Sequence, residues 1–546
     1  MAQTRRAFLV TSTAAAAAAA APPWLWRSGV LERGGRREAP RITQSDLRAL
    51  AARAVDVARS AGAAYADVRL THTYGRSITP EGTHQAGLIS DSEEMTVGVR
   101  ALVNGYWGFA ASPAWTADEM ARLGHEAVDL AKVNAAGKPR VVDLAPAPGN
   151  ETGHWETPLR IDPFSVPVDE VLDFLGAFRV YGGENYGGDL GIQIGCQFTR
   201  QEKAFASTAG AFVTQALTAI GVGFQIAWLK APPGEDPKAV SDLLPLAGHG
   251  WEYVRDNEAG LRAEIPRLIA ELEADWRLPS KPVDVGRYDM VLDAAGMAEL
   301  VDATLGTATE LDRALGYEAN AGGTSYLDDP LAMLATLQVA SPVVTLTGSR
   351  STPGGLATVQ WDDEGVRPDD FALVKDGVFT DYQTTREAAG WLREAYAKRG
   401  VAQRSHGCAN AQSALFAPLI FPPNLQLEPG KQELALEDLL AGLDRGVYVR
   451  GLGLGLDFQQ RSGWSREGLF YEVKGGKRVA RLQHAGLLFR TAELWKALTA
   501  LGGPASLRWT PAQRAKGEPA QWAAYSVGAV PARFKQQTVI DTWRKA

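Results

Sequence analysis

The spacing of apolar residues changes twice within the first 135 residues, and this change restricts the fold more than any other feature. Apolar residues recur at helical spacing over 44–60, alternate with period two in three stretches between 64 and 110, and return to helical spacing after Thr116. An Asn104-Gly105 pair, typical of a tight hairpin turn, joins the last two alternating stretches. The pattern predicts a sheet with helices packed against it.

The length of the chain, 546 residues, exceeds what one hydrophobic core usually supports. A charged helical stretch over 251–276 ends in two prolines, and the pattern restarts near Ser280 with a new alternating strand over 288–293. We therefore predict two large domains, 40–280 and 281–546. The expected fold class is α+β, with antiparallel or mixed sheets flanked by helices.

Local signals predict further elements and their ends. Ser45 is the expected N-cap of the first helix, and Thr116 with Glu119 fits a capping box at the second. Pro266 predicts a kink inside the helix over 251–276. The remaining predictions are a linker over 146–167, a helix near 168–178, antiparallel strands over 191–229, and helices over 295–314 and 436–443.

Composition and charge argue against several classes of protein. Hydrophobic residues make up 45% of the chain and charged residues 22%, as in folded globular proteins. The net charge is -7 and no cluster of Lys and Arg stands out, so we expect no nucleic-acid partner. The two cysteines, Cys196 and Cys408, lie far apart in the sequence. Neither a disulfide between them nor a paired-cysteine metal site is favoured.

The first 30 residues resemble a twin-arginine export signal. Arg5 and Arg6 precede the Phe8-Leu9 pair, and an alanine-rich apolar run follows to Ala21. This run is shorter than the roughly 20 residues that span a bilayer, and no later stretch reaches that length without charges or glycines. We predict a leader over 1–30, no transmembrane span in the mature chain, and a periplasmic or extracellular location. The alternatives are a chance Arg-Arg pair and an uncleaved anchor.

Several short stretches carry a resemblance through their order and spacing. They are ADVRL at 66–70, TVGVRALVNGYWGFAA at 96–111, RQEKAFAS at 200–207, DDEGV at 362–366, KDG at 375–377 and GVYV at 446–449. Together they resemble the TldD/PmbA family, the metallopeptidase family also described as modulators of DNA gyrase. The resemblance implies a two-domain α+β fold and a zinc-dependent ancestry.

The resemblance also implies where zinc should bind. Active members carry an H-E-x-x-x-H helix, in which two histidines bind zinc and the glutamate is the general base. In this chain Asp302 and Thr307 occupy the histidine positions, and Ala303 occupies the glutamate position. The positions that keep the family's residues are Gly306, Glu310 and Asp312.

The family's third zinc ligand is a cysteine, and the matching segment here, 514–518 (RAKGE), has none. We therefore predict no catalytic residue and no bound zinc. His406 and Cys408 are the weaker alternative, because they place two metal-ligand types close together. A loop pair with a buried thiol is the simpler interpretation. A metallopeptidase with such a non-standard metal site remains a further alternative.

The family provides a role for a chain without zinc ligands. Its PmbA members, also called TldE, lack the metal motif and assemble with TldD into a heterodimer that encloses the TldD active site. The resemblance thus implies a non-catalytic subunit that pairs with a TldD-like homologue, or self-associates, and meets unfolded peptides. The alternative from another class is a peptide-binding or scaffold protein without a peptidase partner.

Overall fold

The computed structural model describes most of the chain after the predicted leader. The described residues are 43–81, 86–135, 142–146, 149–186, 190–228, 239–240 and 244–543. The leader over 1–30, with Arg5 and Arg6, lies outside them. The fold is α+β, as predicted. Among the helices described, none combines the length and the apolar composition that crossing a membrane requires.

Four long antiparallel strands form the centre of the first sheet: β1 (Tyr65–Glu81), β2 (Ala86–Val103), β5 (Leu190–Ser207) and β6 (Phe212–Trp228). Each has 17 or 18 residues, which corresponds to about 55–60 Å at about 3.3 Å per residue. The strand order is β3-β2-β1-β5-β6-β4, and β7 and β8 pair with β6. The shorter strands are β3 (Tyr106–Ser112), β4 (Thr152–Glu156), β7 (Ala239–Val240) and β8 (Leu244–Ala247).

Two features of this sheet test the sequence analysis. The Asn104-Gly105 turn is confirmed, because both residues have positive φ (51° and 82°) between β2 and β3. The linker predicted over 146–167 is wrong in part, since it contains β4 and a 3-10 turn (Pro163–Ser165). β4 pairs in parallel with β6, and Pro- and Gly-rich neighbours hid so short an edge strand.

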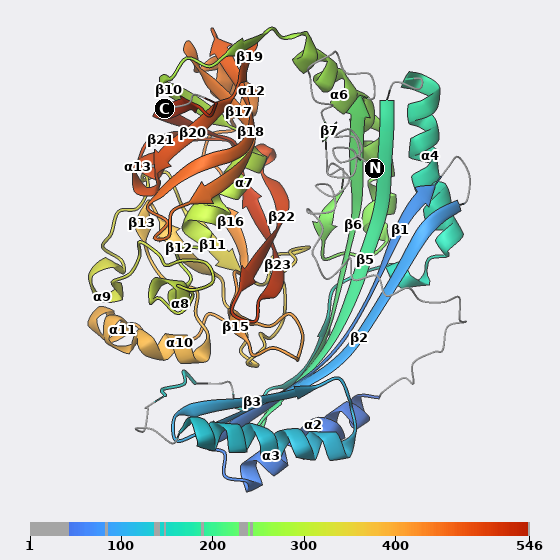
Figure 1. Ribbon diagram of the computed structural model, residues 1–546, viewed down its shortest axis with the longest axis vertical. Helices are drawn as coiled ribbons and strands as arrows, with labels where there is room; N and C mark the ends of the chain where they lie inside the picture. Colours follow the sequence, from blue (N-terminus) through green and yellow to red (C-terminus); the bar gives the residue numbers. More distant parts are fainter. Residues whose placement is uncertain are drawn as a thin grey trace, which may run out of the picture.

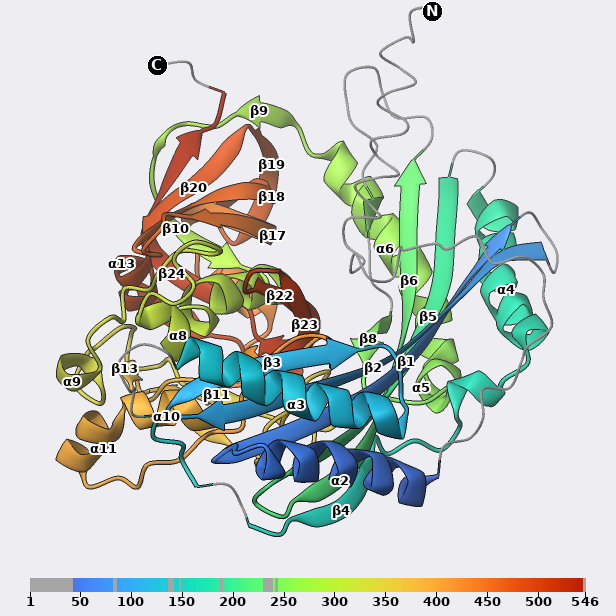
Figure 2. The ribbon, with the colours of Figure 1, turned by 60° about the horizontal axis from the view of Figure 1, so that its bottom comes forward.

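Helices α2 (Gln44–Ser60) and α3 (Ala117–Asn134) lie side by side under one end of the first sheet (Figures 1 and 2). The predicted N-cap Ser45 is wrong: Thr43 caps α2, and its hydroxyl accepts from the Asp46 amide at 3.2 Å. At α3 the Thr116 hydroxyl accepts from the Glu119 amide, as predicted. Small buried residues of both helices allow close packing on the strands.

Helices α4 (Val168–Tyr186), α5 (Glu252–Asp256) and α6 (Glu258–Arg277) cover the other end of the long strands. The single helix predicted over 251–276 is wrong. It breaks at Asn257, whose side-chain amide donates to the Tyr253 carbonyl at 2.7 Å, whereas Pro266 lies within α6. Asparagine favours such local bonds over helical geometry.

The second half of the chain contains three more sheets. The largest has the order β17-β10-β24-β20-β18-β19-β9, with β21 on β24, and β17 also pairs with β18. Its strands are β9 (Ser280–Pro282), β10 (Gly286–Leu292), β17 (Arg445–Leu456), β18 (Ser462–Lys474), β19 (Lys477–Gln483), β20 (Ala485–Arg490), β21 (Leu498–Leu501) and β24 (Ala532–Asp541).

The next sheet, in the order β13-β12-β11-β16-β23-β22, carries the site described below. Its strands are β11 (Leu346–Ser349), β12 (Phe371–Lys375), β13 (Val378–Phe379), β16 (Asn424–Leu427), β22 (Arg508–Lys516) and β23 (Gln521–Ala529). A two-stranded ladder joins β14 (Ala409–Asn410) and β15 (Leu419–Ile420). The surrounding helices are α9 (Pro330–Met333), α10 (Arg386–Trp391), α11 (Arg393–Arg399), α12 (Leu436–Ala441) and α13 (Thr491–Lys496), with a 3-10 turn at Pro504–Ser506.

Buried charges join the first sheet to the second half of the chain. Arg100 of β2 lies 2.6 Å from Asp67 of the neighbouring β1 and 3.3 Å from Glu364. Lys203 of β5 lies 2.5 Å from Asp363. Both acceptors from the second half belong to the Asp-Asp-Glu-Gly segment at 362–365, so one tight turn connects two strands of the first sheet.

Candidate functional site

The segment that matches the family's metal helix is not one helix, so the prediction over 295–314 is wrong in this respect. The Asp293 carboxylate caps its start by accepting from the Gly296 amide at 2.8 Å. The segment then divides into α7 (Ala294–Leu300), a π-helical turn (Val301–Gly306) and, after a break, α8 (Leu311–Ala314).

Threonine side chains inside the segment account for the wide turn. The Thr304 hydroxyl donates to the Leu300 carbonyl at 2.5 Å. The amide and the hydroxyl of Thr307 both donate to the Asp302 carbonyl at 2.9 Å, which is a spacing of five residues. Side-chain bonds of this kind compete with the regular helical ladder. Wide turns inside helices occur often at functional sites.

Asp302 faces strands β22 and β23. Its Oδ1 accepts from Arg514 Nη2 at 2.6 Å and from the Tyr525 hydroxyl at 2.5 Å. Thr307 uses its hydroxyl on the backbone, and Ala303 has no polar side chain. The structure therefore brings Asp302 and the 514–518 segment together, as the family resemblance implied, but through a cation rather than a metal.

Lys516 is fully buried between Glu310 and Asp312. Its Nζ lies 2.9 Å from Glu310 Oε2 and 2.7 Å from Asp312 Oδ1. Arg313 Nε lies 3.1 Å from Glu310 Oε2, and Arg514 Nε lies 3.2 Å from Glu310 Oε1 without hydrogen-bond geometry. We call these five residues together with Asp302 the ion-pair cluster; it contains three carboxylates and three cations.

Burial and the three cations act in opposite directions on the carboxylates of this cluster. Burial opposes the ionisation of Glu310, but Lys516, Arg313 and Arg514 outweigh it and lower the Glu310 pKa to about 2. Burial raises the pKa of Asp302, against the charge of Arg514. Burial also raises the Asp312 pKa, and the charge of Glu310 adds to this effect while Lys516 opposes it. On acidification, Asp312 therefore takes up a proton before Glu310.

These residues do not fit a zinc ion. A catalytic zinc needs three neutral or anionic protein ligands and an open fourth position. Here the carboxylates of Asp302, Glu310 and Asp312 already contact cations, and Thr307 donates its hydroxyl to the backbone. Across the part of the chain that the structure describes, no group of three or more His, Cys, Asp or Glu side chains could hold a metal ion.

His406 and Cys408, the weaker metal candidates, occupy separate surroundings. His406 Nδ1 lies 2.8 Å from Asp369, Nε2 lies 3.4 Å from Asp381, and the ring stacks on Phe371 at 3.9 Å. Although burial opposes it, these two carboxylates raise the His406 pKa, which favours a cation rather than a ligand. Burial raises the Cys408 pKa to about 12, so the thiol stays protonated at neutral pH. Both cysteines of the chain are free.

The sequence analysis missed Arg514, Lys516 and Tyr525. A signal was present in RAK at 514–516, because residues two apart in a strand point to the same face. Glu310 and Asp312 have the same two-residue spacing. Opposite charges in matching spacing were therefore visible, but only the fold shows that the two segments meet.

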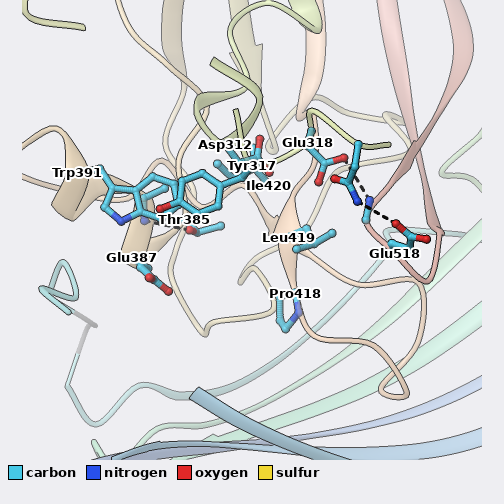
Figure 3. Close-up of a pocket in the computed structure, with 13 residues that line it drawn as sticks. Asp312, Tyr317, Glu318, Thr385, Glu387, Trp391, Pro418, Leu419, Ile420 and Glu518 are labelled. Atoms are coloured by element: carbon cyan, nitrogen blue, oxygen red, sulfur yellow. Dashed lines mark hydrogen bonds between the residues drawn. The ribbon is translucent and has the colours of Figure 1, made fainter. Parts of the chain in front are cut away.

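A cavity of about 370 Å³ lies next to the ion-pair cluster (Figure 3). Its wall includes Asp312 of the cluster and Gly517, the residue after Lys516. The rest comes from the loop after α8, from α10 and from the segment that leads into β15. The ion-pair cluster thus borders a concave space.

Comparison with known proteins identifies the family of this chain. The model of PmbA/TldA metallopeptidase domain 1 matches residues 66–131, and the model of the PmbA/TldA metallopeptidase C-terminal domain matches 285–539. The chain belongs to the TldD/PmbA family. The C-terminal match covers the ion-pair cluster, so the cluster occupies a segment common to this metallopeptidase family.

Individual relatives of this TldD/PmbA chain are distant. A metalloprotease of Methanocaldococcus jannaschii is 22% identical over 78% of this chain and 86% of its own length. A metalloprotease of Methanothermobacter thermautotrophicus is 26% identical over 65% of this chain and 69% of its own length. The crystal structure of TldE from Thermococcus kodakarensis superposes with a TM-score of 0.68 at 15% identity, covering 90% of this chain and 99% of that one. At this identity the structural likeness supports the fold.

Proposed function

We propose that this protein is a non-catalytic, TldE-like subunit of a metallopeptidase complex that acts on unfolded peptides. One observation carries the proposal: Lys516 and Arg514 form ion pairs with the acidic side chains where the family's zinc site would lie. Carboxylates that are already paired with buried cations are poor ligands for a further cation, because like charges would be brought together. The family's fold around this segment is nevertheless kept. This supports a role that depends on the shape of the subunit and not on zinc catalysis.

The partner in this proposal is a TldD-like homologue that keeps the H-E-x-x-x-H helix. The structural similarity to TldE of Thermococcus kodakarensis supports this choice, since the family resemblance implies that TldE-type chains pair with TldD. A stable interface of standard size buries at least about 1,200 Å² in total. Such a complex should survive purification.

Co-expression with a zinc-bearing homologue from the same genome tests the proposal. We expect a stable complex that cleaves unfolded peptides, while this chain alone does not. Asp302→Asn in this chain should leave the activity of the complex unchanged, whereas replacing a zinc-binding histidine of the homologue should abolish it. If the two chains elute separately at micromolar concentration and the homologue is fully active alone, the peptide-binding or scaffold alternative replaces the proposal.

Export is a separate part of the proposal and rests on Arg5 and Arg6 before an apolar run. The twin-arginine pathway moves folded proteins, which suits a subunit that could assemble before export. Replacing both arginines with lysine should retain the protein in the cytoplasm. Unchanged export of the double variant would contradict the assignment.

A further inference from the structure

The cavity beside the ion-pair cluster carries negative charge and no positive charge on its wall. Four carboxylate residues line it, and no Lys, Arg or His does, among the residues that the structure describes. In Figure 3, Glu318 and Glu518 lie at one end and the rings of Tyr317 and Trp391 at the other. The cavity is therefore both acidic and aromatic.

Glu318 is the decisive residue, because it is buried without a counter-ion. Its residue surface is only 5% exposed, and its Oε2 accepts from the Gly517 amide at 3.2 Å. Within the described residues, no Lys, Arg or His nitrogen lies within 4.0 Å of its carboxylate. This differs from Asp312, which Lys516 neutralises at 2.7 Å. Glu318 thus adds a negative charge without a counter-ion to the wall of the cavity, and a cationic ligand could pair with it.

The opposite end of the cavity suits the hydrocarbon stem of a ligand. Tyr317 and Trp391 stack with ring centroids 4.7 Å apart and planes 9° apart, while Tyr317 remains 56% exposed. The exposed ring of Tyr317 provides a flat apolar surface on which such a stem can pack. Between the two ends, Pro418 and Leu419 provide apolar wall for methylene groups (Figure 3).

We infer that this cavity binds a primary ammonium group carried on an apolar stem, as in a lysine side chain or the amino terminus of a peptide. The ammonium pairs with Glu318, assisted by Glu518 at the rim, and the stem lies along Leu419 toward Tyr317. A volume of about 370 Å³ is at the lower end of the range for small-molecule sites, which suits one or two residues of a peptide. Only one part of the inference rests on the proposed function, namely that the ammonium group belongs to a peptide.

Titration calorimetry on the full chain, without any partner, tests the inference with three probes. Nα-acetyl-lysine N-methylamide carries the ammonium on the side chain, leucinamide carries it at the amino terminus, and Nα-acetyl-norleucine N-methylamide has no ammonium. We expect at least one of the first two to bind about tenfold or more tightly than the norleucine probe. The tighter of the two identifies the source of the ammonium. Equal affinity of all three, or no heat for any of them, overturns the inference.

Matched variants locate the binding. Glu318→Gln keeps the shape and an acceptor for the Gly517 amide, and should weaken the ammonium probe about tenfold or more. Glu437→Gln, an exposed carboxylate in the first turn of α12, should leave the affinity unchanged. Tyr317→Leu changes a surface ring, and should weaken binding several-fold without unfolding the protein. Full binding by Glu318→Gln overturns the inference.

The outcomes separate this inference from the proposed function. Ammonium binding without complex formation would support the site and contradict the partner-subunit proposal. If the complex is active but this chain alone shows no preference for an ammonium group, the partner-subunit proposal is supported and the ammonium site is contradicted.

Discussion

Lys516 joins two carboxylates of the ion-pair cluster. It is buried completely and contacts two carboxylates at 2.7 and 2.9 Å. The contacts with Glu310 and Asp312 offset the cost of burying the charge of Lys516. Glu310 also contacts Arg313 and Arg514, so Asp312 depends more on Lys516 than Glu310 does.

Replacing Lys516 with methionine should therefore destabilise the protein by about 3–5 kcal/mol, the usual cost of leaving a buried partner unpaired. Without the lysine, the pKa of Asp312, which burial already raises, would rise further above its unfolded value. Such groups stabilise the fold at low pH and lose this contribution as the pH rises through the folded pKa. The deficit should be smaller at pH 5 than at pH 8, measured by urea unfolding.

Lys474→Met is the matched control for this prediction. Lys474 lies 3.2 Å from Glu472, but its side chain is 56% exposed and Glu472 also contacts Lys281. Its loss should cost no more than about 1 kcal/mol. A similar deficit for the two variants, or a Lys516→Met deficit that does not depend on pH, would show that the cluster is not an electrostatic unit.

At the scale of elements, periodicity predicted some segments well and failed where side chains bond to their own backbone. Helix α2 (Gln44–Ser60) and the β2-β3 turn follow directly from local pattern. The helix over 295–314 was interrupted by threonine hydroxyls, and the helix over 251–276 was interrupted at Asn257. The spacing of apolar residues carries no information about these bonds, because Thr and Asn do not contribute to it. Their side chains interrupt a helix only where they reach a nearby backbone group.

Helix α3 can lie close to β3 because Gly108 has no side chain. A Cβ at Gly108 would lie 2.0 Å from the Ala127 carbonyl oxygen and 2.4 Å from the Ala131 amide nitrogen, both backbone atoms of α3. Neither can move without shifting the helix. Gly108→Ala should therefore destabilise the protein by about 1–3 kcal/mol, as overpacking usually does. The midpoint of urea unfolding measures the effect.

Gly260→Ala is the control, because it should change the stability of the protein in the opposite direction. Gly260 lies in α6, and a Cβ added there would meet no atom within 4 Å outside its own helical turn. The substitution should therefore stabilise the helix by up to about 1 kcal/mol. If Gly108→Ala were tolerated as well as Gly260→Ala, the close approach of α3 to β3 would be wrong.

At the scale of the whole molecule, the sequence indicated an α+β fold, but not how the first sheet and the second half of the chain meet. The Asp-Asp-Glu-Gly segment at 362–365 was visible only as a family motif, yet its carboxylates contact Arg100 and Lys203 from strands more than 150 residues earlier. The same holds for the ion-pair cluster, where Asp302 meets Arg514. Long-range charge pairing has no local period, so local pattern cannot predict it.

Arg100 is one of the buried residues that join the two parts. Its guanidinium binds both oxygens of Asp67, at 3.1 and 2.6 Å, and Glu364 at 3.3 Å. The other oxygen of Glu364 accepts from the Arg386 amide at 2.7 Å, which extends the connection to α10. All three charged side chains are buried.

Arg100→Met should leave Asp67 and Glu364 buried without their shared cation and cost about 3–5 kcal/mol. Asp67 belongs to the first sheet and Glu364 to the second half of the chain. The substitution should therefore weaken the contact between the two parts as well as the stability of each part. We expect calorimetry to resolve two unfolding transitions where the wild type has one. Arg76→Met is the control. Arg76 lies on β1 and pairs at 2.6 Å with Asp91, whose side chain is 53% exposed. The loss of this pair should cost at most about 1 kcal/mol and leave a single unfolding transition. Two transitions in both variants, or one in both, would contradict a special role for the buried arginine.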